Sequence, residues 1–432
     1  MEIERLLSEC QYAELRVETS SRAAITIKDR EIKQSFGETT GISVRVLENG
    51  SWGFASGNNI KELISKAQKL ARLSSGKIKI TRSEPEKKRV GTKLNITDTT
   101  EQAKPLMDAE KLMRIKNITS TIISCTDSTL KKEYYNSLGS EIIQESGYTY
   151  LSCSAIARSG ENIQRGSQRS WSKSGFDKLD PYKTASEAGE KASKLLNAVA
   201  APKGRYTVVL DPEMTGVFSH EALGHACEAD SIVDRESVLS GKIGQQIGNS
   251  MVSIVDDPTA YDFGSYTYDD EGSKALPAVL VENGILKNFM TSMETAHALN
   301  LDKNGHARAQ DYSTVPIVRM SNTYFQKGEF GVDEVFGINS GIYLKGMKGG
   351  SVDIFSGGFM FKAEEAYEIK KGEKGKMMRD VTITGNILET LMNVECVGND
   401  FGTSPGICGK FGQEVPVSDG GPHIRIRNVA IG

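Results

Sequence analysis

Hydrophobic and polar residues alternate with a period of two through the first part of the chain, from Ala13 to Ala55. This period is typical of half-buried strands, and the segment divides into ELRVETS, AAITIKD, EIKQSFG and GISVRVLENG. Gly41 and the pair Asn49-Gly50 are turn residues, so the pattern predicts a meander of strands after a short N-terminal helix. From Asn58 to Leu73 the period changes to about 3.6. That change predicts a helix, with Asn58 or Asn59 as its cap.

A second cycle of strands and a helix fills the middle of the chain. Residues 75–104 are polar and contain the run EPEKK, which predicts a linker with little structure of its own. Strand-like stretches then run from Ser120 to Trp171, and a helix is predicted from about Pro181 to Val199. The pattern therefore predicts one α+β unit at 1–74, the linker at 75–104 and a second α+β unit at 105–200.

The remaining residues, 201–432, are rich in glycine and in short strand patterns. YTVVL predicts a buried strand, and later segments such as VSIVDD and VTITGNIL predict antiparallel strands and hairpins. One helix is predicted after YTVVL, with Asp211 as its cap and Pro212 at its first position. The predicted fold class is α+β. Two N-terminal meander-plus-helix units precede a large, antiparallel, β-rich C-terminal domain that carries this helix.

The predicted helix contains His220, Glu221 and His225 in the sequence HEALGH. Metal-binding histidines on a regular helix are usually four residues apart, which leaves their rings about 40° apart. A gap of five places the rings about 140° apart, too divergent to share one ion. A single π-type turn brings the second ring back over the first. The spacing therefore predicts a π-bulge between His220 and His225, with Gly224 easing the distortion.

Cys408 is the candidate third ligand, because it lies in a glycine-rich segment that can turn tightly and present one side chain inward. An inert, buried cysteine is the competing interpretation, and Cys227, Glu228 and Asp230 are rival ligands near His225. Two His, one Cys and a water form an open site of the catalytic type, with Glu221 as general base. A fourth ligand from Glu228 or Asp230 would instead make a structural zinc site.

Composition and charge limit the classes of protein to which this chain can belong. The 432 residues are 38% hydrophobic and 25% charged, as in an ordinary globular protein. A net charge of -3 argues against a nucleic-acid binder, and no apolar run reaches the roughly 18 residues of a membrane span. The six cysteines are scattered and the acidic N-terminus lacks the pattern of a secretory signal. A cytoplasmic location is expected.

Several segments resemble the TldD/PmbA family of metallopeptidases, whose members have also been described as modulators of DNA gyrase. The resemblance covers essentially the whole chain. Its most specific segments are HEALGHACEAD at 220–230, SGKIGQQIGNSMVSIVDDPT at 240–259, PIVRMSNTY at 316–324 and CGKFGQEVPV at 408–417. The stretch GISVRVLENGSWGFAS at 41–56 resembles the N-terminal signature of the family.

The resemblance implies a role for each part of the motif. The family pairs an active TldD-type subunit, which has HExxxH, with a PmbA-type subunit, also called TldE, which lacks it. This chain keeps the motif, so it resembles the active type, with ligands His220, His225 and Cys408 and base Glu221. His423 departs from the small or aliphatic residue expected in GGPHIRI, and a second-shell place and simple exposure are both open for it.

The resemblance also implies a substrate and a partner. Family members process peptide precursors such as microcins and degrade an antitoxin. They form a dimer whose inner cavity admits unfolded or extended peptides by strand addition. The predicted function is Zn²⁺-dependent hydrolysis of such peptides, in a homodimer or in a heterodimer with an inactive TldE-type relative. The alternative is a non-catalytic peptide-binding or regulatory subunit. Arg308 and His306 are weaker candidates for stabilising an oxyanion, and a surface salt bridge is an equally good interpretation.

Overall fold

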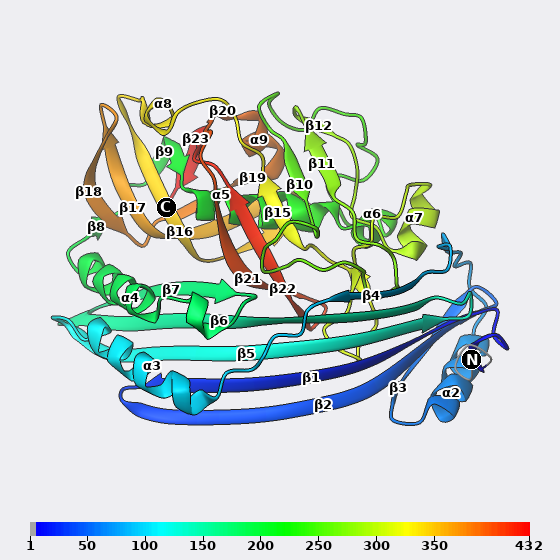
Figure 1. Cartoon of the computed structure of the whole chain (residues 1–432). Coiled ribbons are helices and arrows are strands. Elements are labelled where there is room, and N and C mark those ends of the chain that lie inside the picture. Colours follow the sequence, from blue (N-terminus) through cyan, green and yellow to red (C-terminus); the bar gives the residue numbers. More distant parts are fainter. Residues whose placement is uncertain (1–5) are drawn as a thin grey trace.

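One seven-stranded sheet forms the base of the molecule (Figure 1). The computed structural model describes residues 6–432. The strand order is β3-β2-β1-β5-β6-β4, with β7 paired to β6. Every pair is antiparallel except β4 with β6. The strands are β1 (Tyr12–Lys28), β2 (Glu31–Glu48), β3 (Ser51–Gly57), β4 (Lys87–Gly91), β5 (Ile118–Asn136), β6 (Glu141–Ser159) and β7 (Asn162–Ser172).

The strands of this sheet are longer than the alternation predicted. ELRVETS and AAITIK lie in the single strand β1, and EIKQSFG and GISVRVLE lie in the single strand β2. Gly41 is therefore not a turn, and that prediction is wrong. It continues β2 opposite Glu18, where a Cβ atom would lie 2.2 Å from the ring of Tyr312. Asn49 and Gly50 do form the predicted turn, with φ angles of 50° and 69°.

Three helices cover one face of the sheet. They are α2 (Ile60–Arg72), α3 (Thr99–Met113) and α4 (Pro181–Leu195). They pack on odd-numbered residues of β1, from Leu15 under α2 to Ile25 and Ile27 under α3 and α4. Asn59 caps α2 by accepting a hydrogen bond from the Glu62 amide at 3.4 Å. The helix predicted at the N-terminus falls partly on residues 1–5, outside the described residues.

The segment predicted as a linker contains regular structure. β4 pairs with β6 through its backbone, which needs no alternation of side chains, so periodicity could not reveal it. The helix α3 begins at Thr99 because the Asp98 side chain accepts from the Thr100 amide at 2.8 Å. Strands from both predicted N-terminal units enter one sheet, and the proposed division of residues 1–200 remains a prediction.

The C-terminal half contains a closed ring of five strands, because β16 pairs with β9 and with β17 in the order β16-β9-β23-β19-β17. Short strands flank this ring at its margins. The ring strands are β9 (Gly204–Leu210), β16 (Ser340–Asp353), β17 (Gly358–Lys370), β19 (Thr382–Asn386) and β23 (Ile424–Ile431). The flanking strands are β8 (Val199–Ala200), β18 (Glu373–Arg379) and β20 (Val394–Val397). The α+β fold class is confirmed.

A second, six-stranded sheet in this half has the order β12-β11-β10-β15-β22-β21. Its strands and the two-stranded pair beside it are β10 (Ile254–Asp256), β11 (Ala278–Glu282), β12 (Ile285–Leu286), β13 (Ala307–Arg308), β14 (Ile317–Val318), β15 (Asn322–Phe325), β21 (Gly402–Lys410) and β22 (Gln413–Gly421). The helices are α5 (Pro212–Phe218), α6 (Ala229–Val233), α7 (Met293–Leu299), α8 (Val332–Phe336) and α9 (Ile387–Met392). None of the helices in residues 6–432 is long and apolar enough to cross a membrane.

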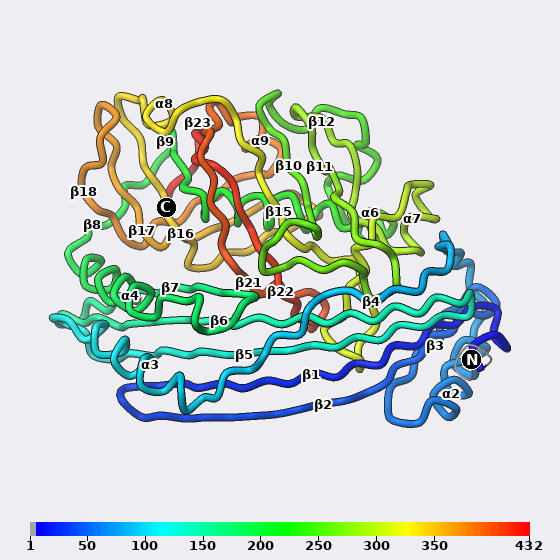
Figure 2. Tube along the Cα trace, in the orientation of Figure 1, coloured from blue at the N-terminus to red at the C-terminus, as the bar shows by residue number. Residues whose placement is uncertain are grey.

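Buried ion pairs join the two halves. The Arg45 guanidinium contacts Glu14 at 2.7 Å within the base sheet and Glu271 at 2.6 Å in the C-terminal half. Lys132 pairs with Asp270 at 2.7 Å. The Cα trace in Figure 2 follows β21 and β22 down to the base sheet. The sheet is thus fixed against the C-terminal half, and the β21–β22 hairpin of that half reaches the base sheet at β7.

Candidate metal centre

The helix α5 positions the metal motif. It follows β9, and the Asp211 side chain accepts hydrogen bonds from the amides of Met214 at 2.8 Å and Gly346 at 3.1 Å. Burial outweighs these bonds and raises the pKa of Asp211 to about 7, with nearby Glu213 acting in the same direction. The predicted cap at Asp211 and the predicted Pro212 at the first helical position are confirmed. Residues after Phe218 therefore leave this helix in a defined direction.

The predicted π-type turn is confirmed. Residues Ser219–Gly224 are π-helical, and the His225 amide donates to the carbonyl of His220, five residues earlier. Gly224 has ordinary right-handed dihedral angles, φ -54° and ψ -56°, so its conformational freedom is not what the turn requires. A Cβ atom there would instead lie 2.1 Å from the sulfur of Met320. Gly224 thus provides space for a neighbouring side chain, and the predicted reason for it is wrong.

His220, His225 and Cys408 come together in space. One potential ligand atom from each lies within 4.8 Å of the other two. The Cys408 Sγ lies 3.6 Å from the His225 Nε2, and the two imidazole rings are perpendicular, with centroids 5.0 Å apart. Among the described residues this is the single group of three or more His, Cys, Asp or Glu side chains so arranged.

A carboxylate faces the other ring nitrogen of each histidine. Asp419 Oδ1 lies 2.7 Å from His220 Nδ1, and neither atom has another hydrogen-bond partner. Glu228 Oε2 lies 3.1 Å from His225 Nδ1. These contacts leave both Nε2 atoms to face the centre of the group. A carboxylate behind each ring is the usual second layer of contacts around a histidine-bound metal. The rival ligand Glu228 therefore contacts the outer side of His225.

The charges of the three residues are mutually dependent. Burial by itself raises the pKa of the Cys408 thiol, but the two imidazoles outweigh it and bring the pKa to about 5. Burial lowers the pKa of His225, yet Glu228 and Cys408 raise it to about 9. Two imidazoles and a thiolate are donors that suit a borderline-soft divalent cation. A cation bound here replaces the imidazole protons, so the residues present fit a metal.

Glu221 lies beside this group but outside it. Its Oε2 is 4.0 Å from the His225 Nε2, and its side chain is 27% exposed. The Cys408 side chain, in contrast, is buried. Glu221 therefore has a partly exposed carboxylate beside the three donors, as a proton acceptor requires.

Sequence reasoning missed two cations that hold the β21–β22 hairpin in place, Lys410 through the segment after the metal motif and Arg319 through the segment after β14. Lys410 is on the same strand as Cys408, and its ammonium lies 2.7 Å from Asp230 and 3.1 Å from Glu228. The fully buried Arg319 donates to the carbonyl of Cys408 at 2.5 Å. These bonds fix the thiolate against the histidines. No spacing rule could have identified them, because they join residues 89 and 180 positions apart in the sequence.

The other candidates lie outside the metal centre. Cys227 is wholly buried with a pKa raised by burial. His306 is also wholly buried, between Asn304 at 2.8 Å and Asp256 at 3.0 Å. Arg308 is buried and donates to the carbonyl of Met320 at 2.6 Å, and it forms no ion pair with any residue of 6–432. The ring of His423 contacts Asp400 at 2.7 Å and Tyr343 at 3.3 Å. These contacts give His423 a structural setting apart from the three donors.

Comparison with known proteins places these features in a family. Three domain families match in order: PmbA/TldA metallopeptidase domain 1 at residues 13–72, the central domain at 83–196 and the C-terminal domain at 203–432. The chain is 42% identical to a metalloprotease of Methanothermobacter thermautotrophicus, over 98% of this chain and 95% of that protein. It is 32% identical to the zinc metalloprotease TldD homolog of Saccharolobus solfataricus, over 98% and 96%.

A solved structure shares the fold. TldE from Thermococcus kodakarensis superposes with a TM-score of 0.82 at 23% identity, and the match covers 100% of both chains. The arrangement of the base sheet, the five-stranded ring and the second sheet is therefore that of a known architecture.

We expect Gly216→Ala to destabilise the fold, because a Cβ atom in α5 would lie 2.4 Å from the amide nitrogen of Gly420 in β22. Overpacking of this kind typically costs about 1 to 3 kcal/mol. Denaturant unfolding measures the loss, and metal content after purification reports displacement of the site. Gly37→Ala is the matched control, since nothing lies within 4 Å of its added Cβ. Equal free energies of unfolding for the two variants would contradict the close approach of α5 to β22.

We expect Lys410→Met to weaken metal binding by about 10 to 100-fold, the usual effect of losing an outer contact. The change leaves Glu228 and Asp230 without their shared cation while keeping a similar side-chain volume. Competition with a chelator of known affinity measures the dissociation constant. Lys287→Met, at an exposed pair with Glu282, is the control. An unchanged dissociation constant in Lys410→Met would show that the ion pairs of Lys410 with Glu228 and Asp230 do not support metal binding.

Proposed function

The chain belongs to the PmbA/TldD metallopeptidase family, and we propose that it is an active, Zn²⁺-dependent member that hydrolyses unfolded or extended peptides. The observation that carries this proposal is the convergence of His220, His225 and Cys408 to within 4.8 Å, with the partly exposed carboxylate of Glu221 beside them. The name of the Saccharolobus solfataricus relative, a zinc metalloprotease, supports zinc as the metal.

The residues divide the chemistry between them. His220 and His225, oriented by Asp419 and Glu228, and the thiolate of Cys408 would hold the ion. Zn²⁺ bound in such a site supplies Lewis acidity and lowers the pKa of water towards about 7. Glu221 takes a proton from the attacking water and returns it to the leaving amine. Three protein ligands leave one position open, as catalytic rather than structural zinc sites require.

An extended peptide has a strand edge available near the metal. β21, which carries Cys408, is the last strand of the six-stranded sheet, so its outer backbone groups face away from β22. Addition of a peptide strand to such an edge is a common mode of peptide recognition. It selects for unfolded chains, because a folded substrate has no free backbone to pair.

We propose that the protein acts as a dimer in the cytoplasm, either with a second copy of itself or with an inactive TldE-type relative. The shared fold with TldE of Thermococcus kodakarensis supports this assembly. The described residues contain six free, buried cysteines and no disulfide, in keeping with a reducing compartment.

We expect Cys408→Ala to lose zinc, while Cys227→Ala keeps it. Both cysteines are buried, but the ligand group contains Cys408 and excludes Cys227. Zinc content per chain after dialysis, measured by elemental analysis, distinguishes the two. Removal of zinc from the natural protein with a chelator should abolish peptide hydrolysis, and added Zn²⁺ should restore it. Zinc retained by Cys408→Ala and lost by Cys227→Ala would place the thiolate ligand elsewhere.

We expect Glu221→Gln to keep zinc and to lose about 10² to 10⁴-fold in kcat for an unstructured peptide, the usual contribution of a general base. The amide has the size of the carboxylate but cannot accept the proton. Peptide hydrolysis followed by mass spectrometry, with zinc content measured on the same sample, checks both parts. Cleavage at the original rate would rule out Glu221 as the base. Absence of cleavage by the natural, zinc-loaded protein would favour a peptide-binding subunit.

A further inference from the structure

One end of the base sheet has a face that no helix covers. Helices α3 and α4 pack on odd-numbered residues of β1, such as Ile25 and Ile27, so even-numbered residues point to the opposite side. Near residue 14 that side is covered by the C-terminal half through Glu14 and Arg45. Between residues 22 and 28 it is uncovered. We call this region the open face, and it consists of Arg22, Ala24, Thr26, Lys28, Glu31, Lys33, Ser35, Gly37, Ile122, Ser124, Thr126, Ser128, Ser152, Ser154, Ile156 and Arg165.

Strand register arranges the open face in rows that cross the sheet. One row contains Lys33, Thr26, Ser124, Ser152 and Arg169, from β2 to β7. The next row contains Ser35, Ala24, Thr126, Tyr150 and Trp171. Small side chains and hydroxyls occupy the middle of both rows. The hydroxyls supply hydrogen-bond donors and acceptors, and the small side chains leave room for a ligand against the sheet.

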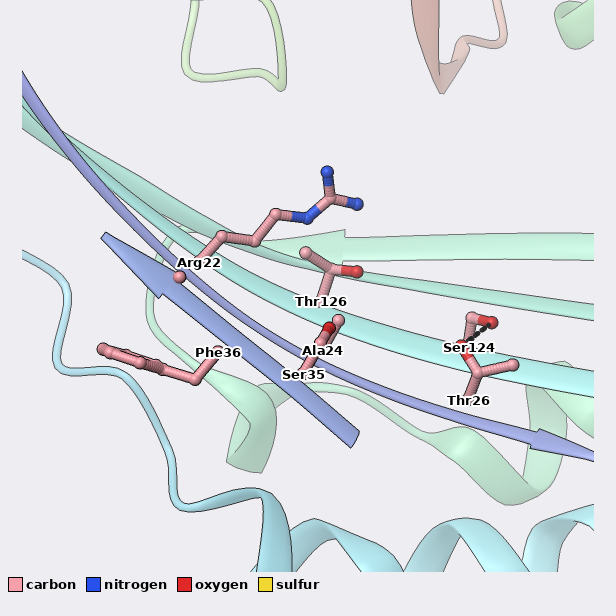
Figure 3. Close-up of a pocket in the computed structure, with 8 residues that line it drawn as sticks. Arg22, Ala24, Thr26, Ser35, Phe36, Ser124 and Thr126 are labelled. Atoms are coloured by element: carbon pink, nitrogen blue, oxygen red, sulfur yellow. Dashed lines mark hydrogen bonds between the residues drawn. The ribbon is translucent and has the colours of Figure 1, made fainter. Parts of the chain in front are cut away.

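These small residues leave a hollow of about 510 Å³ on the open face, within the usual range for ligand pockets. Figure 3 shows Arg22 extending from β1 beside Thr126, while the hydroxyls of Thr26 and Ser124 meet in a hydrogen bond of 2.8 Å. Phe36, 71% exposed, lies at the margin. The hollow is lined by eight residues with one charge among them, that of Arg22.

The cations of the open face lack carboxylate partners. Within residues 6–432, neither Arg22, Lys33 nor Arg165 forms an ion pair. Arg165 donates to the hydroxyl of Ser154 at 2.8 Å. This bond holds the guanidinium against the open face. Elsewhere on this sheet buried cations are paired, as Lys132 is with Asp270. The open face therefore carries a net positive charge, with Glu31 as the one carboxylate among its residues.

Packed side chains and hydrogen bonds connect the open face to residues of the metal centre. Tyr150 and Trp171, at the end of the second row, pack around Phe263, each with a centroid distance of 5.6 Å. The Phe263 amide donates to the Ser418 hydroxyl at 3.2 Å, and Ser418 precedes Asp419, the partner of His220. At the end of the first row, Arg169 pairs at 3.0 Å with Glu213 of α5.

We propose that the open face is a second substrate-binding surface, which holds an acidic, extended segment of a peptide while another part of that peptide reaches the metal. This inference rests on the proposed function. Glutamate and aspartate side chains would pair with Arg22, Lys33 and Arg165, and backbone groups would bond to the serine and threonine hydroxyls. The rows span about 19 Å from β2 to β7, and about six extended residues cover that distance.

A peptide suits the open face better than a nucleic acid does. Nucleic-acid surfaces combine a dense row of cations with aromatic side chains on which bases stack. Here the cations lie on three separate strands and the rows between them contain hydroxyls.

Peptide binding without turnover tests the proposal. Fluorescein-labelled, unstructured peptides of about 12 residues, one rich in Glu, one in Gln and one in Lys, are titrated with full-length Glu221→Gln protein at low salt, and anisotropy is recorded. We expect the acidic peptide to bind most tightly, and salt of about 0.5 M to remove its advantage. Because Glu221→Gln does not need to cleave, a failure of the proposed hydrolysis leaves this result interpretable.

The triple variant Arg22→Gln, Lys33→Gln, Arg165→Gln should bind the acidic peptide about tenfold more weakly, with the neutral peptide unaffected. The matched control is Lys61→Gln, Lys66→Gln, Lys69→Gln, which removes the same charge from the exposed surface of α2 and should change affinity less than about twofold. Equal affinity for the acidic and neutral peptides, or equal loss in both triple variants, would overturn the proposal. Tighter binding of a single-stranded oligonucleotide at the same residues, or a triple variant that dissociates a dimer, would also overturn it.

Discussion

The metal centre depends on one backbone hydrogen bond, from the His225 amide to the His220 carbonyl. Five residues separate the two histidines, and on a regular helix their rings would diverge by about 140°. The π turn removes that divergence and leaves the ring centroids 5.0 Å apart. The bond persists because both ends of the turn are fixed. Asp211 caps the helix before it, and Glu228 contacts His225 just after it.

The third donor reaches this turn only because the β21–β22 hairpin is held in place. β22 pairs in parallel with β15, from Asn322 opposite Ser418, and this brings Asp419 to His220. Arg319 and Lys410 then fix the Cys408 end of β21. A thiolate between two imidazoles in a buried site is electrostatically favourable only when the geometry is fixed. The cations and carboxylates around the site supply that geometry and compensate one another's charge.

Local patterns predicted a helix from Asn58 to Leu73, observed as α2 at Ile60–Arg72, and they also predicted the Asp211 cap and the π turn. Each of these features depends on neighbouring residues. The placement of Cys408 did not follow from spacing, since the ligand lies 183 residues from His225. The family resemblance selected it over Cys227, Glu228 and Asp230. Gly41 was mistaken for a turn because its real neighbour, Tyr312, is distant in sequence. Similarly, β4 and the Lys410 ion pairs are products of tertiary contact and leave no periodic trace.

X-ray absorption spectroscopy at the zinc edge is the most direct measurement of the central claim. The zinc-loaded protein should show two nitrogen scatterers at about 2.0 to 2.1 Å and one sulfur scatterer at about 2.3 Å, plus one light-atom scatterer from the open position. Cys408→Ser should lose the sulfur contribution while Cys227→Ser keeps it. A spectrum with no sulfur, or with sulfur that survives Cys408→Ser, would contradict a site formed by the π turn and the β21 thiolate.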